Sequence, residues 1–305
     1  MPHVLAVLVA ALLFGTTGTA QALGPADTTP LGVGVARMLV GGTVLGVVAF
    51  LLARPHRRRA DRPVFGARPF ALMAATAVAL TVYQPLFFLG TATNGVAVST
   101  VIALGSAPVL AGVMEWALTR RLPSRTWIGA TALATVGVVL LGVGGGAGTD
   151  GAEPVGVLGA IGAGASFAVI AVAQRRLLDA GWDAFTVVGA MGAGSAVLCL
   201  ALLPFVDLSW ITEPSGILMA AWLGLATIAA AYALFTWGLQ GLTAATAATL
   251  TLGEPLTAAL LGVTLLGEQL SPLAITGLIV LGAGLAALAW GSRRQADPAP
   301  FAVEG

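Results

Sequence analysis

Long apolar runs, separated by short polar segments, make up nearly the whole chain. An α-helix rises 1.5 Å per residue, so a helix needs about 20 apolar residues to cross roughly 30 Å of hydrocarbon. Ten runs of about this length lie near residues 4–23, 31–53, 69–91, 95–118, 127–145, 155–174, 184–206, 216–239, 243–266 and 272–291. This pattern predicts an all-α membrane protein with ten transmembrane helices.

The composition agrees with lipid as the main solvent. Of the 305 residues, 58% are hydrophobic and only 9% are charged, whereas soluble domains average roughly 25% charged residues. The polar residues 292–305 are expected to form a disordered cytoplasmic tail. The first run ends in Ala20-Gln21-Ala22, which resembles a signal-peptidase site, but no Lys or Arg precedes it, so we interpret this run as the first span.

The placement of the arginines predicts the orientation. If the N-terminus is cytoplasmic, 13 of the 14 basic residues, all of them arginines, fall in cytoplasmic segments. The outside loops then contain acidic residues and no arginine, which is the positive-inside pattern of membrane proteins. We therefore expect both termini in the cytoplasm and the chain in a bacterial plasma (inner) membrane.

The two halves of the chain resemble each other at an offset of about 147 to 149 residues. Residues 104–110 align with residues 252–256, and Tyr83 aligns with Tyr232. We divide the chain into a first repeat over residues 1–145 and a second over 146–291, each with five predicted spans. An odd number of spans gives the repeats opposite orientations, so the chain is predicted to hold two inverted five-helix repeats, an arrangement common in secondary transporters.

Short motifs in both halves carry a resemblance to a known family. In the first half they are Leu-Phe-Gly-Thr-Thr at residues 13–17, Pro30 followed by Arg37, and Pro108; in the second half they are Ala-Tyr-Ala-Leu at 231–234 with Trp237, Gly-Glu-Pro at 253–255, and Leu-Gly-Glu at 266–268. With ten runs and a repeat, the chain resembles the drug/metabolite transporter superfamily, in particular its EamA-type members. Phe14 departs from the tryptophan that many members have there, and Arg120 or Arg121 stands where an acidic residue is frequent.

Glu254 is the first candidate for substrate contact. A charge at mid-membrane costs roughly 2.5 to 3.5 kcal/mol on insertion scales, so it must face protein or water. Glu254 lies near the middle of the ninth run and precedes Pro255, which frees a backbone carbonyl one turn back. A substrate amine or a proton could bind at this carboxyl group. The alternative is a structural carboxyl group hydrogen-bonded to Thr251 or Thr257.

Two other charged residues lie within predicted spans. Arg37 sits about 10 Å into the second span by helix rise, where it could neutralise a substrate carboxylate. Its long stem also allows it to snorkel to the outer interface, and the sequence favours this second interpretation. Glu115 lies within two turns of Arg120 and Arg121, which predicts an interfacial ion pair.

Further candidates are prolines and residues with aromatic or amide side chains. Pro108 mirrors Pro255 across the repeat, and paired breaks in corresponding helices indicate a transporter site. Aromatic walls and hydrogen bonds for an amphipathic solute could come from Tyr83, Gln84, Tyr232 and Trp237. Taken singly, such residues also serve in packing or as interface anchors.

The resemblance implies a secondary transporter that exports an amino acid or a related small metabolite by alternating access. Its cavity would lie at mid-membrane between the repeats, with Glu254 and Arg37 contacting the opposite charges of a zwitterion. Substrate and direction rest on the family analogy alone. The partners are a small-molecule substrate and the lipid bilayer, with protons as a candidate coupling ion and no nucleic acid.

Other classes are less consistent with the residues. Two histidines (His3, His56) and one cysteine (Cys199) provide no zinc-type cluster, no nucleotide-binding P-loop is present, and no cofactor is expected. A membrane enzyme acting on lipid-linked substrates would need clustered nucleophiles, acids or metal ligands near the span ends, which the sequence does not offer. A lipid scramblase or a sensor stays open as an alternative.

Overall fold

The computed structural model describes residues 1–56, 66–145 and 153–292, and every regular element in them is helical. The elements are α1 (Pro2–Ala22), α2 (Pro30–His56), α3 (Ala67–Asn94), α4 (Val96–Thr119), α5 (Arg125–Gly144), α6 (Pro154–Asp179), α7 (Ala184–Leu200), η1 (Leu203–Phe205), η2 (Ser209–Thr212), α8 (Pro214–Trp222), η3 (Leu223–Ala230), α9 (Ala231–Gly238), α10 (Ala244–Leu250), α11 (Gly253–Leu265) and α12 (Pro272–Ser292). The all-α fold class is confirmed for these residues. The predicted tail at 293–305 lies outside them.

Nine helical segments in the described ranges are long and apolar enough to span a membrane. Of the ten predicted runs, the run at 184–206 has a helix shorter than the length needed for a span, because α7 has only 17 residues. After Leu200 the backbone turns into the short 3-10 helix η1, which contains Pro204. A proline has no backbone N–H and disfavours helical geometry in the residue before it, so α7 stops short of the predicted end. Ten spans and the orientation of the termini stay predictions.

Polar side chains at three N-termini explain where their helices begin. Ser124 Oγ accepts a hydrogen bond from Trp127 N at 3.1 Å at the start of α5. Asp183 Oδ1 accepts from Thr186 N at 3.0 Å at the start of α7. Thr243 does the same before α10, and such side chains satisfy backbone N–H groups that have no partner within the helix.

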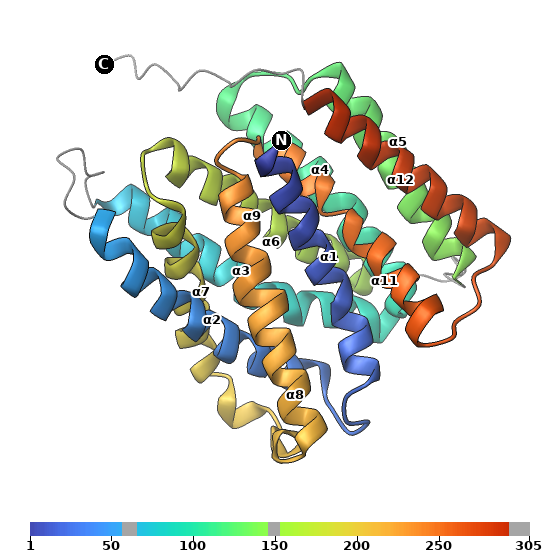
Figure 1. The fold of residues 1–305 in the computed structure, drawn as a ribbon, viewed down its shortest axis with the longest axis horizontal. Coiled ribbons are helices and arrows are strands. Elements are labelled where there is room, and N and C mark those ends of the chain that lie inside the picture. The colour runs from blue at the N-terminus through green and yellow to red at the C-terminus, as the bar shows by residue number, and fades with distance from the viewer. Residues whose placement is uncertain (57–65, 146–152, 293–305) are drawn as a thin grey trace.

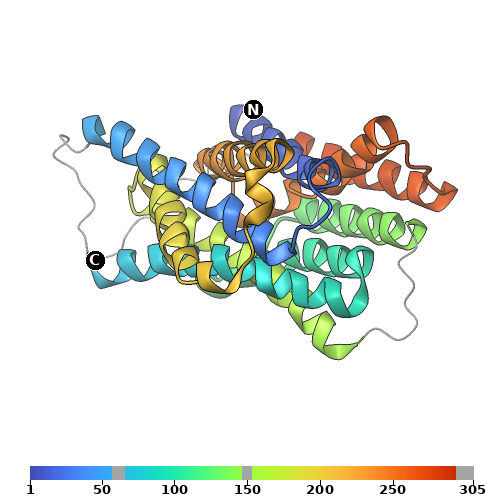
Figure 2. The same cartoon turned by 90° about the horizontal axis from the view of Figure 1, so that it is seen from below.

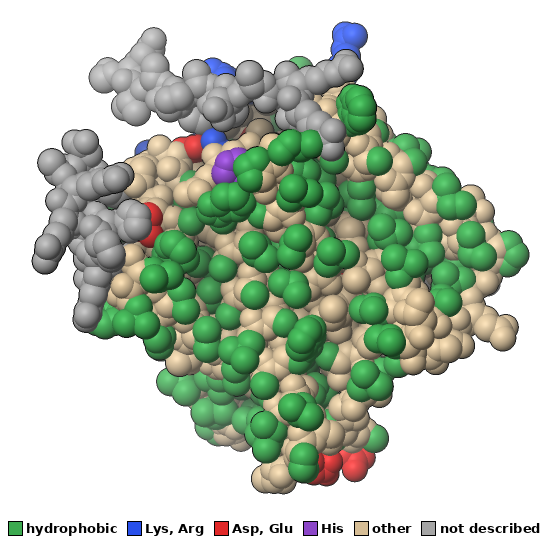
Figure 3. All heavy atoms as spheres, in the orientation of Figure 1, with side chains coloured by type: hydrophobic (Ala, Val, Ile, Leu, Met, Phe, Trp, Pro, Cys, Tyr) green, Lys and Arg blue, Asp and Glu red, His purple; other side chains and the backbone are tan. Residues whose placement is uncertain are grey.

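The surface of the bundle is largely apolar. Hydrophobic side chains are spread over the whole face in Figure 3, and the charged side chains in view lie toward its two ends. Large side chains such as Leu5, Leu158 and Ile279 expose more than half of their area. An exposed apolar belt between polar ends suits a hydrocarbon environment, where burial in protein is not needed to remove these side chains from water.

Helices far apart in the sequence pack in pairs. The closest pairs are α5 with α12, α3 with α6, and α2 with α7, while α1 lies against α9 and α11 (Figures 1 and 2). The pairs α2–α7 and α5–α12 join elements that the predicted repeat makes equivalent. The division at residues 145 and 146 and the inverted orientation of the halves stay predictions.

Two of the spanning segments depart from regular α-helix. The segment from Pro214 to Gly238 contains the π-helical stretch η3, which ends at Ala230, two residues before Tyr232. The segment from Ala244 to Leu265 breaks at Thr251 and Leu252. Pro255 cannot donate to Thr251 O, and Glu254 N donates to it instead at 2.9 Å. By contrast, α4 continues unbroken through Pro108, so the mirrored prolines do not produce mirrored breaks.

Backbone contact between α5 and α12 leads to a first prediction. A Cβ added at Gly137 would collide with the backbone N and Cα of Leu281, whereas one added at Gly282 would meet nothing within 4 Å. Gly137→Leu must separate the two helices and is expected to cost about 2 kcal/mol of unfolding free energy. Thermal unfolding in detergent, with Gly282→Leu as the control, measures the difference. Equal midpoints for the two variants would contradict the expectation.

Candidate functional site

A cavity opens between the helices near the break of the α10–α11 segment. Its volume of about 110 Å³ exceeds the roughly 10–15 Å³ that one water needs on this scale, so it has room for a small solute. Seven helices contribute to it, together with the break itself. The lining residues are Phe14, Thr17, Gln21, Val33, Arg37, Tyr83, Gln84, Phe87, Phe88, Ala103, Leu104, Ala107, Gly164, Phe167, Tyr232, Thr251 and Glu254.

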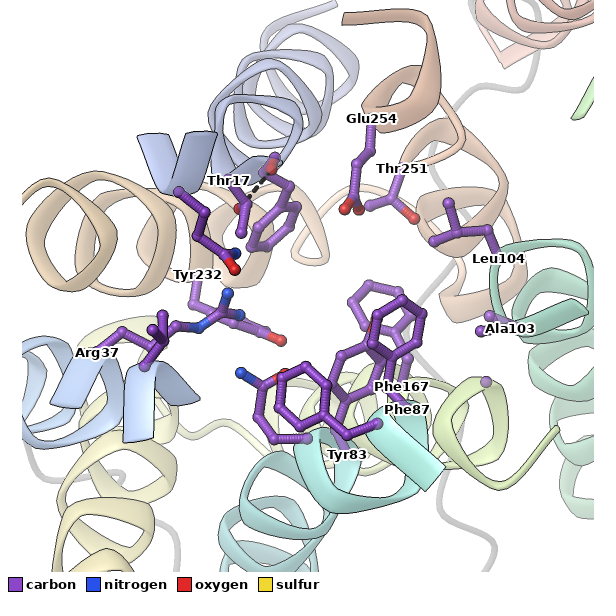
Figure 4. A pocket seen from close by; sticks show the side chains of 17 residues that line it. Thr17, Arg37, Tyr83, Phe87, Ala103, Leu104, Phe167, Tyr232, Thr251 and Glu254 are labelled. Carbon is purple, nitrogen blue, oxygen red and sulfur yellow. Dashed lines mark hydrogen bonds between the residues drawn. The ribbon is translucent and has the colours of Figure 1, made fainter. Parts of the chain in front are cut away.

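Two opposite charges face this cavity from different sides. Arg37 projects from α2 and Glu254 from the first turn of α11, with open space between the two side chains (Figure 4). No ion pair within 4.0 Å joins Arg37 to Glu254 in the described residues. Arg37 and Glu254 therefore do not neutralise each other by direct contact.

The guanidinium of Arg37 has unused hydrogen-bonding capacity. Its Nε is buried and finds no hydrogen-bond partner among the described residues. The side chain lines the cavity (Figure 4), so the prediction that Arg37 snorkels to the outer interface is wrong. A buried donor without a partner costs free energy, and a carboxylate entering the cavity would supply acceptors for it.

The carboxyl group of Glu254 also faces the cavity, and the neighbouring threonine hydroxyls do not bind it. Thr251 Oγ1 donates to Ala248 O at 2.8 Å, and Thr257 Oγ1 donates to Gly253 O at 3.0 Å. A hydroxyl group has one proton to donate. Neither threonine can therefore also donate to Glu254, and the structural alternative with a threonine partner is not seen.

Aromatic rings form much of the remaining wall. Phe14 and Tyr232 meet edge to face with centroids 5.1 Å apart, and Tyr83 stacks on Phe87 at 6.0 Å. Phe88 and Phe167 also line the cavity. Such walls suit the apolar part of a small amphipathic solute.

Five of the eight candidate residues from the sequence line this one cavity: Arg37, Tyr83, Gln84, Tyr232 and Glu254. Pro108 and Pro255 are buried within α4 and α11 but are not part of the lining. Trp237 is 40% exposed, and its ring centroid lies 4.8 Å from that of His3, away from the cavity. The binding roles of all eight stay predictions.

Sequence reasoning did not select most of the lining residues as candidates. Phe14 was noted only as a departure from the family pattern, and Phe87 was not singled out. Helical spacing was the available signal for Phe87, because it follows Tyr83 by four residues and therefore lies on the same face of the helix.

Glu115 has a different partner from the one predicted. Its Oε2 accepts a hydrogen bond from Ala245 N at 2.9 Å, in the first turn of α10. The sequence did not predict this backbone partner, and the ion pair of Glu115 with Arg120 or Arg121 stays a prediction. The N-terminus of α10 offers unpaired N–H groups and the positive end of the peptide dipoles, and both favour a carboxylate there.

Arg175 also makes contacts at this end of the bundle, next to the start of α10. Its Nη1 donates to three carbonyl oxygens of the α9–α10 loop, those of Leu239 at 2.6 Å, Leu242 at 3.0 Å and Gln240 at 3.3 Å. Its Nη2 forms the ion pair with Asp179 Oδ1 at 2.8 Å. The arginine thus ties α6 to the loop that follows α9.

The EamA-like transporter family matches two stretches of the chain, residues 1–143 and 154–290. The chain belongs to this family. It is 40% identical over 293 residues to the "Uncharacterized transporter YwfM" of Bacillus subtilis (strain 168), across 95% of this chain and 94% of that protein. A solved structure described as "Crystal structure of protein" has a TM-score of 0.77 and 21% identity, with 96% of this chain and 98% of that one covered. The family and the apolar helices identify an integral membrane transporter.

Proposed function

We propose that this EamA-family transporter is a secondary transporter that exports an amino acid or a related small zwitterion by alternating access. One observation carries the proposal: Arg37 and Glu254 face one cavity without pairing with each other. A carboxylate bound at Arg37 and an ammonium group bound at Glu254 would satisfy both half-buried charges at once.

The shape and lining of the cavity support a small solute with an apolar part. Six aromatic side chains are among the residues that surround it. A zwitterion that carries a hydrophobic side chain would place its charged end between Arg37 and Glu254 and its apolar end against these rings.

The state of the molecule follows from the predicted topology. The lining includes Gln21 near the end of α1 and Val33 near the start of α2, both of which the arginine distribution assigns to the outer side. At the opposite end, contacts of Arg175 and Glu115 hold the α9–α10 loop and the start of α10. We therefore assign this arrangement to an outward-facing state of two inverted repeats with cytoplasmic termini.

Glu254 is also the candidate for proton coupling. A carboxyl group in a cavity within the membrane can alternate between a proton and a substrate ammonium group. Uptake driven by a pH gradient would then be lost in Glu254→Gln. A full response of that variant to the gradient would rule out coupling through this residue.

Counterflow in proteoliposomes tests the proposed function. Vesicles loaded with a mixture of unlabelled amino acids receive one radiolabelled amino acid at a time, beginning with L-phenylalanine and L-leucine, beside protein-free vesicles. Accelerated entry of a subset supports the proposal and gives the substrate class. Entry at the protein-free rate for every amino acid would remove the amino-acid assignment while leaving membership of the transporter family intact.

A further inference from the structure

Gly15 brings helix α1 into contact with the backbone that carries Glu254. A Cβ added at Gly15 would lie 2.6 Å from Glu254 O and 2.6 Å from Thr257 Cβ. Carbon atoms in contact are most stable at about 3.5–4.0 Å. No side chain larger than hydrogen fits here unless α1 and α11 move apart.

The position of this contact links it to the cavity. Phe14, the preceding residue on α1, lines the cavity, and so does Glu254 on the opposite side of the contact. Thr17, two residues after Gly15, also lines the cavity. The spacing between α1 and α11 therefore determines where the Glu254 carboxyl group stands relative to the aromatic wall and to Arg37.

We propose that Gly15 is a positioning residue for Glu254: it allows α1 to hold the first turn of α11 so that the carboxyl group faces the ammonium group of the solute. The inference rests on the proposed function for the identity of that solute. It adds a residue that touches the site through backbone packing and contributes no side chain to the cavity.

Close backbone approach alone does not distinguish Gly15, because other glycines do the same. Gly137 contacts the backbone of Leu281 as closely, yet neither residue lines the cavity. A purely structural role for Gly15 predicts that Gly15→Ala and Gly137→Ala behave alike. A positioning role predicts that only Gly15→Ala changes the site.

The experiment compares three alanine variants by counterflow of radiolabelled L-phenylalanine. Gly15→Ala is expected to raise the half-saturating concentration about tenfold, since misplacing a binding group by a fraction of an ångström to 1 Å weakens its contact strongly. Gly18→Ala, on the same helix with nothing within 4 Å, controls for the substitution. Gly137→Ala controls for packing, and both controls are expected to keep the wild-type half-saturating concentration.

A double-mutant cycle tests whether Gly15 acts through Glu254. In a Glu254→Gln background, Gly15→Ala should add less than about twofold, because two changes that affect one interaction are not additive. Full additivity would overturn the positioning role. If Glu254→Gln itself left L-phenylalanine counterflow unchanged, the proposed function would fail at Glu254, which is a different outcome from an inert Gly15→Ala.

A readout that needs no substrate completes the test. Dicyclohexylcarbodiimide adds to neutral carboxyl groups in apolar surroundings, and peptide mass spectrometry measures its addition to Glu254. Separation of α1 from α11 admits water, which favours the carboxylate, so Gly15→Ala should slow this labelling by about threefold or more relative to both controls. Labelling at the rate of Gly18→Ala would overturn the inference, whichever amino acids are transported.

Discussion

Replacing Arg37 with alanine is expected to lower the transport rate of an amino acid at subsaturating concentration by about 100-fold. Truncating one partner of a buried, hydrogen-bonded charge pair costs about 2–5 kcal/mol, and each 1.4 kcal/mol is a factor of about ten. Arg37 faces the cavity, and its Nε has no hydrogen-bond partner among the residues that the structure describes, so the carboxylate of the solute would be its main partner. Counterflow of radiolabelled L-phenylalanine measures the loss.

Charge-deleted solutes show which group each residue contacts. Phenethylamine lacks the carboxylate, so Arg37→Ala should transport it at least as well as the wild type does. Conversely, Glu254→Gln should discriminate less than the wild type against 3-phenylpropanoate, which lacks the ammonium group. If Arg37→Ala lost phenethylamine and L-phenylalanine transport equally, the arginine would be structural and the assignment of the solute carboxylate to it would be wrong.

The fold was predictable where one physical requirement dominates. The length of an apolar run is set by the hydrocarbon thickness, and nine such helices appear in the described residues. The run at 184–206 shows the limit of this reasoning, because hydrophobicity continues past Leu200 while the helix does not. Pro204 was a visible signal there, since helices seldom continue through the residue before a proline.

The candidate site was predictable in its charges and less so in its walls. Arg37 and Glu254 stand out because charge within an apolar span is costly, and both line the cavity. Phe87 and Phe167 line it as well, but a phenylalanine within an apolar span looks the same whether it faces lipid, protein or a cavity. Only the packing of helices decides which of these it faces.

Partners distant in sequence were the contacts that the sequence did not predict. Glu115 was assigned to the nearest arginines, and the structure adds a backbone N–H 130 residues away as a hydrogen-bond partner. The snorkelling prediction for Arg37 likewise considered its own helix and the interface, without the cavity that α3, α9 and α11 form beside it. Local spacing predicts which groups need a partner, and tertiary packing supplies it.

Loss of Arg175 is expected to be the most destabilising single change that the structure indicates. Its Nη1 donates to three carbonyl groups of the α9–α10 loop, and Nη2 pairs with Asp179. Arg175→Ala removes this ion pair and leaves the carbonyls at the end of α9 without their cation, which should lower the free energy of unfolding by about 3–4 kcal/mol. Denaturant unfolding in detergent micelles measures the change.

Arg176→Ala is the matched control, since the neighbouring arginine has the same charge, while the described part of the chain shows no hydrogen bond or ion pair for it. This control is expected to stay within about 0.5 kcal/mol of the wild type. Arg175→Lys keeps the charge, but an ammonium group cannot reach the three carbonyls and Asp179 as a planar guanidinium does, so an intermediate loss of stability is expected.

Faster amide hydrogen exchange in Ala244–Leu250 should accompany the loss of stability in Arg175→Ala. This local opening would reach the site, because α9 carries Tyr232 and α10 leads to Glu254. Equal stability of Arg175→Ala and Arg176→Ala would show that these hydrogen bonds are replaced by water at no net cost, and that the α9–α10 loop is held by its apolar contacts alone.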